Sequence, residues 1–263
     1  MPLAKTRGPK YGKCNICGDD ADLTSDHVPP KGVLKFNRVD LHNIAVALSA
    51  EETGPIKGRF FQRGVKFRSI CQNCNRDLLG ALYDPELVSF SNDVSRYLTS
   101  QLTLPAIAKF SVRPGLIAKA IAGHILAIGL ERFPRGVMGD ALAEFVRDPD
   151  SAPPDGLSIF YWPYPYWSQI LIRGFGIGIN WGSPCVVASV IKFWPMAYMI
   201  TYNHDQRIRF FHMDLCKFIV GAGQSKVELP VRLTNIPAEH YPEAPDESGI
   251  RLHGEDSYYV RRR

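Results

Sequence analysis

The chain has 263 residues, of which 45% are apolar and 22% are charged, with a formal net charge of +5. This composition is typical of a globular protein with one large core or two smaller ones, and we expect two domains. The charge is compatible with a polyanionic partner but does not itself indicate one. The apolar window at residues 115–130 is shorter than the ~20 residues that cross a bilayer and contains Lys119 and His124, so we expect a core helix and no membrane partner.

Residues 1–13 are polar and basic, unlike a secretory signal, and we therefore expect a cytoplasmic protein. In a chain without an export signal, disulfides are not expected to persist. Four of the six cysteines form Cys-x-x-Cys pairs, Cys14 with Cys17 and Cys71 with Cys74. This spacing favours metal binding over oxidation.

The paired cysteines supply the ligands of a closed, tetrahedral Zn²⁺ site. The stretch between the pairs is too long for a compact single finger, so a folded segment is expected there, with structural zinc joining its ends. A redox pair and chance pairs of buried cysteines remain as alternatives.

The sequence DHVPPK at residues 26–31 lies between the two pairs, and Asn75 directly follows Cys74. This order of motifs resembles the HNH branch of the ββα-metal endonucleases over residues 14–86, about a third of the chain. The resemblance implies that His27 is the general base and that Asp26 and Asn75 bind one hard divalent ion, with Mg²⁺ favoured. Helix capping is an equal alternative for Asn75.

The chemistry of the DHVPPK segment can also be argued without the resemblance. Hydrolysis of a phosphodiester needs a water to be deprotonated and charge on the phosphate to be neutralised. A neutral imidazole suits His27 to the first task, and a carboxylate suits Asp26 to the second. Neighbours on a strand point to opposite faces, so the two side chains would not duplicate each other. A surface Asp-His pair is the alternative.

One part of the HNH pattern is missing. Many HNH proteins have a middle Asn shortly before the second cysteine pair, whereas residues 66–70 read KFRSI here. Asn43 or a backbone carbonyl could orient His27 instead, and His42 is a further candidate. Asp84 and Glu86 could complete a metal shell, although a solvated helix face is favoured for both.

Basic residues gather from residue 57 to residue 76, where six Lys or Arg side chains occur and no acid. We expect this stretch to contact the sugar-phosphate backbone of nucleic acid, with a solvated loop as the alternative. The expected contact residues are Lys31, Arg63, Lys66, Arg68 and Arg76.

Helical patterns follow from about residue 77, at 115–132 and at 137–146. The proline-rich stretch 148–156 predicts a linker. Strand formers then predict strands at 157–162, 169–172, 176–179, 186–193, 197–202 and 207–211. Residues 238–263 are predicted to form a polar surface tail.

The run of residues 161–167 has five aromatic side chains in seven positions. It could stack bases or line a ligand pocket, but core and turn packing is favoured. Cys185, Cys216, His204 and His212 have no ligand spacing and are expected to be structural. We hypothesise that residues 157–235 contact a target, a regulator or a second copy of the chain.

Together these features predict an α+β protein. Its expected parts are a zinc-stapled ββα-metal module at residues 1–100, a helical segment at 101–150 and a β-rich domain at 151–263. The expected function is a metal-dependent endonuclease with structural Zn²⁺ and catalytic Mg²⁺, acting on DNA rather than RNA. The alternative is an inactive, zinc-stabilised protein that binds nucleic acid or serves as a scaffold.

Overall fold

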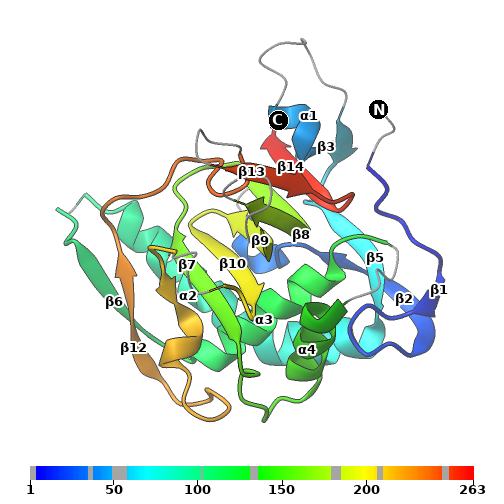
Figure 1. The fold of residues 1–263 in the computed structure, drawn as a ribbon, viewed down its shortest axis with the longest axis horizontal. Coiled ribbons are helices and arrows are strands. Elements are labelled where there is room, and N and C mark those ends of the chain that lie inside the picture. Colours follow the sequence, from blue (N-terminus) through cyan, green and yellow to red (C-terminus); the bar gives the residue numbers. More distant parts are fainter. Residues whose placement is uncertain are drawn as a thin grey trace.

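In the described part of the chain, three β-sheets and a small set of helices make up the mixed α/β fold of the computed structural model (Figure 1). The structure describes residues 4–34, 38–48, 58–101, 103–130, 136–178, 185–205, 210–244 and 249–263.

The N-terminal part is a three-stranded antiparallel sheet followed by a long helical arm. The sheet has the order β1 (Tyr11–Lys13), β2 (Asp20–His27) and β5 (Lys66–Cys71). After β5 the chain enters a π-helix, η2 (Asn73–Tyr83), which continues directly into α2 (Asp84–Leu98). Pro85 lies in the first turn of α2, directly after η2, and the helical arm runs on through this residue.

The largest sheet has nine strands and draws on both ends of the chain. Its order is β11-β7-β10-β9-β8-β14-β3-β4, and β13 pairs with β8 off this path. The strands are β3 (Val39–Asn43), β4 (Arg59–Phe61), β7 (Leu157–Pro163), β8 (Gln169–Gly178), β9 (Cys185–Phe193), β10 (Met196–Tyr202), β11 (Met213–Asp214), β13 (Ile250–His253) and β14 (Ser257–Arg262).

Most of the predicted strands are confirmed. The two predicted at 169–172 and 176–179 form the single strand β8, with a register shift between Ile172 and Phe175. The strand predicted at 207–211 is not observed in its described part, because Phe210 and Phe211 lie in irregular structure and residues 207–209 lie outside the described residues.

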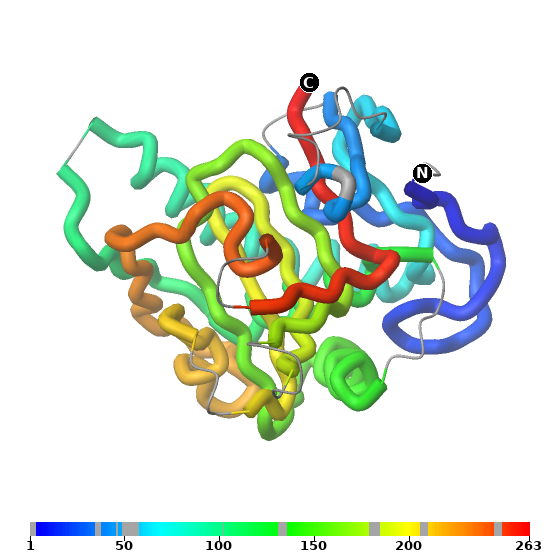
Figure 2. The backbone as a smooth tube through the Cα atoms, turned by 45° about the horizontal axis from the view of Figure 1, so that its top comes forward, coloured from blue at the N-terminus to red at the C-terminus, as the bar shows by residue number. Residues whose placement is uncertain are grey.

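The prediction of a polar surface tail at residues 238–263 is wrong. Strand β14 pairs with β8 on one side and with β3 on the other, so the C-terminal segment joins the two ends of the chain within one sheet (Figure 2). Ser257, Tyr258 and Val260 are buried, whereas the arginines at 261–263 are exposed. The average polarity of the segment concealed the short apolar stretch that enters the sheet.

Helix α3 (Pro114–Ala127) is buried along its whole length, which confirms the predicted core helix. It contacts η2, α2 and α4 (Gly136–Arg147), and it also packs on strands β5, β8 and β9 (Figure 1). Its Lys119 is accommodated because the ammonium group donates to the carbonyl of Phe145 in the last turn of α4 and to those of Asp148 and Ser151 just beyond it. Among the described residues, no helix is long and apolar enough to cross a membrane.

The remaining elements are short. They are η1 (Lys31–Val33), α1 (Ile44–Leu48), β6 (Ile107–Val112), η3 (Leu215–Phe218) and β12 (Val227–Arg232), which pairs with β6. One buried apolar cluster runs from Cys14 in the N-terminal module through α3 to Val260 in β14. The N-terminal module, the central helices and the large sheet therefore share a core.

Candidate metal centre and active site

The four paired cysteines converge on one point. Cys14 and Cys17 lie in the turn before β2, Cys71 ends β5, and Cys74 lies in the first turn of η2. Their sulfur atoms all lie within 4.8 Å of one another, and Cys17 Sγ is 3.8 Å from Cys71 Sγ. In the described part of the chain, this is the one group of three or more His, Cys, Asp or Glu side chains close enough to hold a metal ion.

The donor set of this cluster fits a zinc ion. Backbone N–H groups of Ile16 and Cys71 point at Cys14 Sγ at 3.4 and 3.3 Å. The hydrogen bond from Cys74, together with these backbone donors, lowers the pKa of the Cys14 thiol to about 4. Burial instead raises the pKa of Cys17 to about 12, and the charge of the Cys14 thiolate adds to this rise. Four sulfurs so arranged could hold Zn²⁺.

The cysteine cluster is joined to the end of helix α3. The Asn15 amide donates to the carbonyl of Leu126 at 3.1 Å, and the Ser69 hydroxyl donates to that of Ala127 at 2.6 Å. These carbonyls belong to the last turn of α3, where helical donors are missing. The metal centre is therefore fixed to the core rather than held by the cysteine loops alone.

Asp26 points into the protein and meets a buried histidine. Its Oδ2 lies 3.2 Å from Nδ1 of His124 on α3, and the other ring nitrogen of His124 lies 2.9 Å from Oδ1 of Asp84 at the start of α2. His124 is completely buried, and the two carboxylates are nearly so. The imidazole thus links the strand that carries the DHVPPK segment to the helical arm.

The charge of His124 follows from this position. Burial acts to lower its pKa, but the carboxylates of Asp84 and Asp26 outweigh burial and raise the pKa of His124 to about 10. An imidazolium between two carboxylates is a paired buried charge, which a protein interior tolerates far better than an isolated one. Asp26 therefore already has a cationic partner.

Asn75 joins η2 to β2, the strand that carries Asp26. Its amide nitrogen donates to Thr24 Oγ1 at 2.8 Å. Thr24 and Asp26 are two residues apart on β2, and the pairing of β2 with β5 shifts register between Thr24 and Ser25. The capping alternative for Asn75 is not observed, since Asn75 lies inside η2 and no side chain caps the start of that helix.

His27 ends β2, opposite Lys66 of β5, and is half-buried. Its ring donates a hydrogen bond to the backbone carbonyl of Arg63. Because Nε2 is buried and has no hydrogen-bond partner among the described residues, that bond comes from Nδ1. Burial, and then the charge of Lys66, lower the pKa of His27, so the imidazole is neutral at pH 7. Its Nε2 carries a lone pair.

The group that contacts the His27 ring is a backbone carbonyl, that of Arg63, and not an Asn side chain. A backbone carbonyl was one of the two expected substitutes, and the contact to His27 is of that kind. Asn43, the other, caps α1 by accepting a hydrogen bond from the N–H of Ala45 at 3.0 Å. His42 lies in β3 opposite Tyr259 of β14, as part of the large sheet.

A basic hollow of about 450 Å³ lies beside the Arg63 loop. It is lined by Lys31, Leu34, Arg38, Gln62 and Arg63. The expected backbone contacts Lys31 and Arg63 are thus brought together. Arg38 was missed by the sequence reasoning, although its positive charge within the insert between the cysteine pairs could have drawn attention to it.

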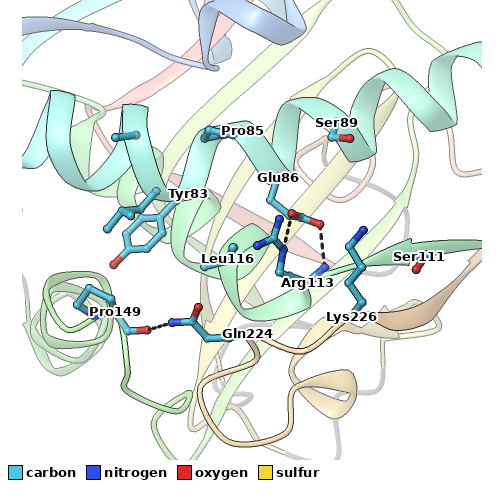
Figure 3. A pocket seen from close by; sticks show the side chains of 12 residues that line it. Tyr83, Pro85, Glu86, Ser89, Ser111, Arg113, Leu116, Pro149, Gln224 and Lys226 are labelled. Atoms are coloured by element: carbon cyan, nitrogen blue, oxygen red, sulfur yellow. Dashed lines mark hydrogen bonds and ion pairs between the residues drawn. The ribbon is translucent and has the colours of Figure 1, made fainter.

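Other expected contact residues lie elsewhere. Arg68 donates to the carbonyl of Gly8 at 3.4 Å, and Arg76 is exposed beside Asp77. Glu86 is nearly buried and accepts hydrogen bonds from the backbone N–H and the side chain of Arg113, each at 2.9 Å (Figure 3). Glu86 therefore anchors the start of α3 and does not join Asp26.

Comparisons of the chain with family models, curated proteins and solved structures found no match. The functional argument therefore rests on the residues and their geometry.

Proposed function

We propose that residues 14–86 form a zinc-stabilised, HNH-type nuclease module that hydrolyses phosphodiester bonds in nucleic acid, DNA in preference to RNA. The observation that carries this proposal is the state of His27. One ring nitrogen donates to the Arg63 carbonyl, the other is buried without a hydrogen-bond partner among the described residues, and a basic hollow adjoins the same loop.

A general base needs a neutral ring held in one orientation. The Arg63 carbonyl selects the tautomer that protonates Nδ1, which leaves Nε2 as the acceptor. A buried ring nitrogen without a partner is costly, and a bound water or substrate hydroxyl would relieve that cost. His27 would take the proton of the attacking water at Nε2.

The substrate phosphate would lie in the basic hollow. The ammonium of Lys31 and the guanidinium of Arg63 would neutralise charge on the phosphate as it is attacked. Arginine is suited to phosphate because its planar fork can donate two parallel hydrogen bonds. These contacts are independent of base identity, so binding would weaken with salt.

The order of elements also supports the proposal. The strand that ends in His27 pairs with β5, and β5 passes directly into η2, although η1, β3, α1 and β4 lie between β2 and β5 along the chain. The cysteines lie before β2 and where β5 passes into η2. The resemblance to the HNH enzymes implies two strands and a helix beside the cysteine pairs, and the β2, β5 and η2 grouping supports the proposal in that respect. A zinc ion with four thiolates has no open position, so it would position the strand and helix rather than react.

The proposed Mg²⁺ would bind side chains that already have partners. Asp26 and Asn75 would hold the ion, which would supply charge neutralisation at the departing oxygen. Asp26 is paired with His124, and Asn75 donates its amide hydrogen to Thr24. Mg²⁺ would therefore share the Asp26 carboxylate with His124, through the oxygen that His124 does not contact, or displace the imidazolium.

The same contact favours a second candidate function. If His124 permanently replaces the ion beside Asp26, the module would bind nucleic acid through its basic hollow without cutting it. This candidate is a zinc-stabilised binding or scaffold protein.

Nicking of supercoiled plasmid, with Mg²⁺ and with EDTA, tests the two functions. We expect the wild type to nick with Mg²⁺ and His27→Ala to be at least ~100-fold slower, the usual contribution of a general base. His240→Ala, a half-exposed histidine outside the module, is the matched control and should nick normally. Retained plasmid binding with no nicking by either the wild type or His27→Ala would replace the nuclease by the binding protein.

A further inference from the structure

A second hollow, of about 430 Å³, lies on the large sheet well away from the cysteine cluster in sequence. It opens beside β7 and β11, next to the chain that follows β12. Its walls include Trp162, Phe211, His212, Arg232, Asn235 and Tyr241. No part of the proposed hydrolysis uses these residues.

One wall of this hollow is made of aromatic rings. Trp162 and His212 stack with their ring centroids 4.4 Å apart and their planes at 23°. Tyr241 packs edge-on against both rings, at 6.1 and 5.3 Å. Trp162 itself is buried, so this ring packing fixes the wall and does not offer the face of Trp162 to a ligand.

Hydrogen bonds hold the walls in place. The Tyr161 hydroxyl donates to the carbonyl of Pro230 at 2.6 Å and ties β7 to β12. The Tyr166 hydroxyl donates to the carbonyl of Pro237 at 3.2 Å, and Lys192 donates to the carbonyl of Tyr241 at 3.1 Å. The hollow is therefore already formed, which lowers the entropic cost of binding a ligand.

Two side chains at this hollow are available to a ligand. Phe211 is 85% exposed, far more than is usual for a phenyl ring. Arg232 is exposed and forms no ion pair within the part of the chain that the structure describes. Burial, and then the charge of Arg232, lower the pKa of His212 to about 4, so His212 is neutral and Arg232 carries the positive charge of this wall.

We propose that this hollow binds one unpaired base of single-stranded nucleic acid. The base stacks on the exposed face of Phe211 beside the Trp162 wall, and Arg232 contacts the adjoining phosphate. Base stacking on aromatic side chains tolerates any sequence. A duplex does not fit this role, because its bases are already paired and stacked. The choice of nucleic acid as the ligand rests on the proposed function. The observations on the aromatic wall and on Arg232 do not depend on it.

The test measures binding without cleavage, in the His27→Ala background. Fluorescence anisotropy compares a short labelled oligothymidine, a strand of equal length made only of abasic sites, and a matched duplex. We expect the oligothymidine to bind more tightly than the abasic strand. Phe211→Ala should weaken oligothymidine binding by roughly 5- to 150-fold, the value of one stacked base, and should leave abasic binding unchanged. Arg232→Gln should weaken both single strands.

Val220→Ala removes an equally exposed apolar side chain outside the hollow, and Arg147→Gln removes an exposed arginine of α4. Both controls should bind as the parent does. Equal affinity for oligothymidine and abasic strand, or a Phe211→Ala variant within twofold of its parent, would each overturn the proposal. A wild type that fails to nick plasmid would remove the nuclease but would leave this result standing, since the readout is binding.

Discussion

His124 Nδ1 lies 3.2 Å from Oδ2 of Asp26, so the carboxylate next to the proposed base is held by the buried helix α3. The same ring reaches Asp84, where η2 passes into α2. The strand that carries His27, the helical arm and the core helix therefore meet at one imidazolium. We expect this contact to govern both the stability of the module and its access to a metal ion.

Removal of the imidazole should destabilise the protein strongly. His124→Leu leaves two buried carboxylates without their cation, and breaking a buried ion pair in this way costs ~3–5 kcal/mol. Urea unfolding followed by circular dichroism measures the change. His240→Leu, at a half-exposed histidine, should cost far less. Similar losses in the two variants would show that His124 does not pair with the carboxylates as described.

The stability of the wild type should fall with alkaline pH because of the same group. The pKa of His124 is raised from 6.5 to about 10 in the folded state. Its contribution is therefore complete below about pH 6.5 and is lost as the pH rises through about 10. The difference in unfolding free energy between the wild type and His124→Gln should shrink over that window. A difference that grows towards alkaline pH would contradict the assignment.

Local signals in the sequence were sufficient for part of this site. The Cys-x-x-Cys spacings predicted the sulfur cluster, and the apolar window at 115–130 predicted α3, because both patterns depend on residues close in sequence. The partner of Asp26 could not be predicted, since His124 lies far along the chain on a helix that reads simply as apolar core. The buried polar side chains of α3 were the available signal, because Lys119 and His124 each need a partner.

The C-terminal segment is a second case in which a contact between distant residues could not be predicted from local sequence. Its composition is polar, yet β14 enters the large sheet through Tyr258 and Val260 and pairs with β3 from the other end of the chain. When two distant segments pair as strands, the only local signal in the sequence is a short alternation of apolar and polar residues in each strand.

Loss of zinc should loosen the N-terminal module. Cys74→Ser removes one of four thiolates and should abolish stoichiometric zinc while lowering the melting temperature, since metal binding and folding are coupled. Cys185→Ser removes an exposed thiol outside the cluster and should keep one zinc per chain. Metal analysis and thermal unfolding check both variants. Full zinc content in Cys74→Ser would contradict the four-sulfur site.

The basic hollow should contribute to nucleic-acid binding through charge. Lys31→Gln and Arg63→Gln should each reduce the slope of log affinity against log salt by about 1, the effect of losing one phosphate contact. Lys109→Gln, an exposed lysine of β6, is the control and should leave the slope unchanged. Equal slopes in all these proteins would place the phosphate contacts elsewhere.

The C-terminal segment should depend on a second buried pair, formed by Lys192 of β9 and Glu243. Both side chains are fully buried, and Lys192 also donates to the carbonyl of Tyr241. Burial acts to lower the pKa of Lys192, and the charge of Glu243 opposes that effect. Glu243→Leu leaves the ammonium without its counter-ion and should cost ~3–5 kcal/mol in urea unfolding.

Adding Lys192→Met to Glu243→Leu should recover part of this loss, because no buried charge remains. Recovery should be incomplete, since the hydrogen bonds from Lys192 to the carbonyls of Glu239 and Tyr241 are also lost. A double variant less stable than Glu243→Leu alone would show that Lys192 holds the segment through its carbonyl contacts rather than through the ion pair. A Glu243→Leu variant as stable as the wild type would show that Lys192 does not need this carboxylate.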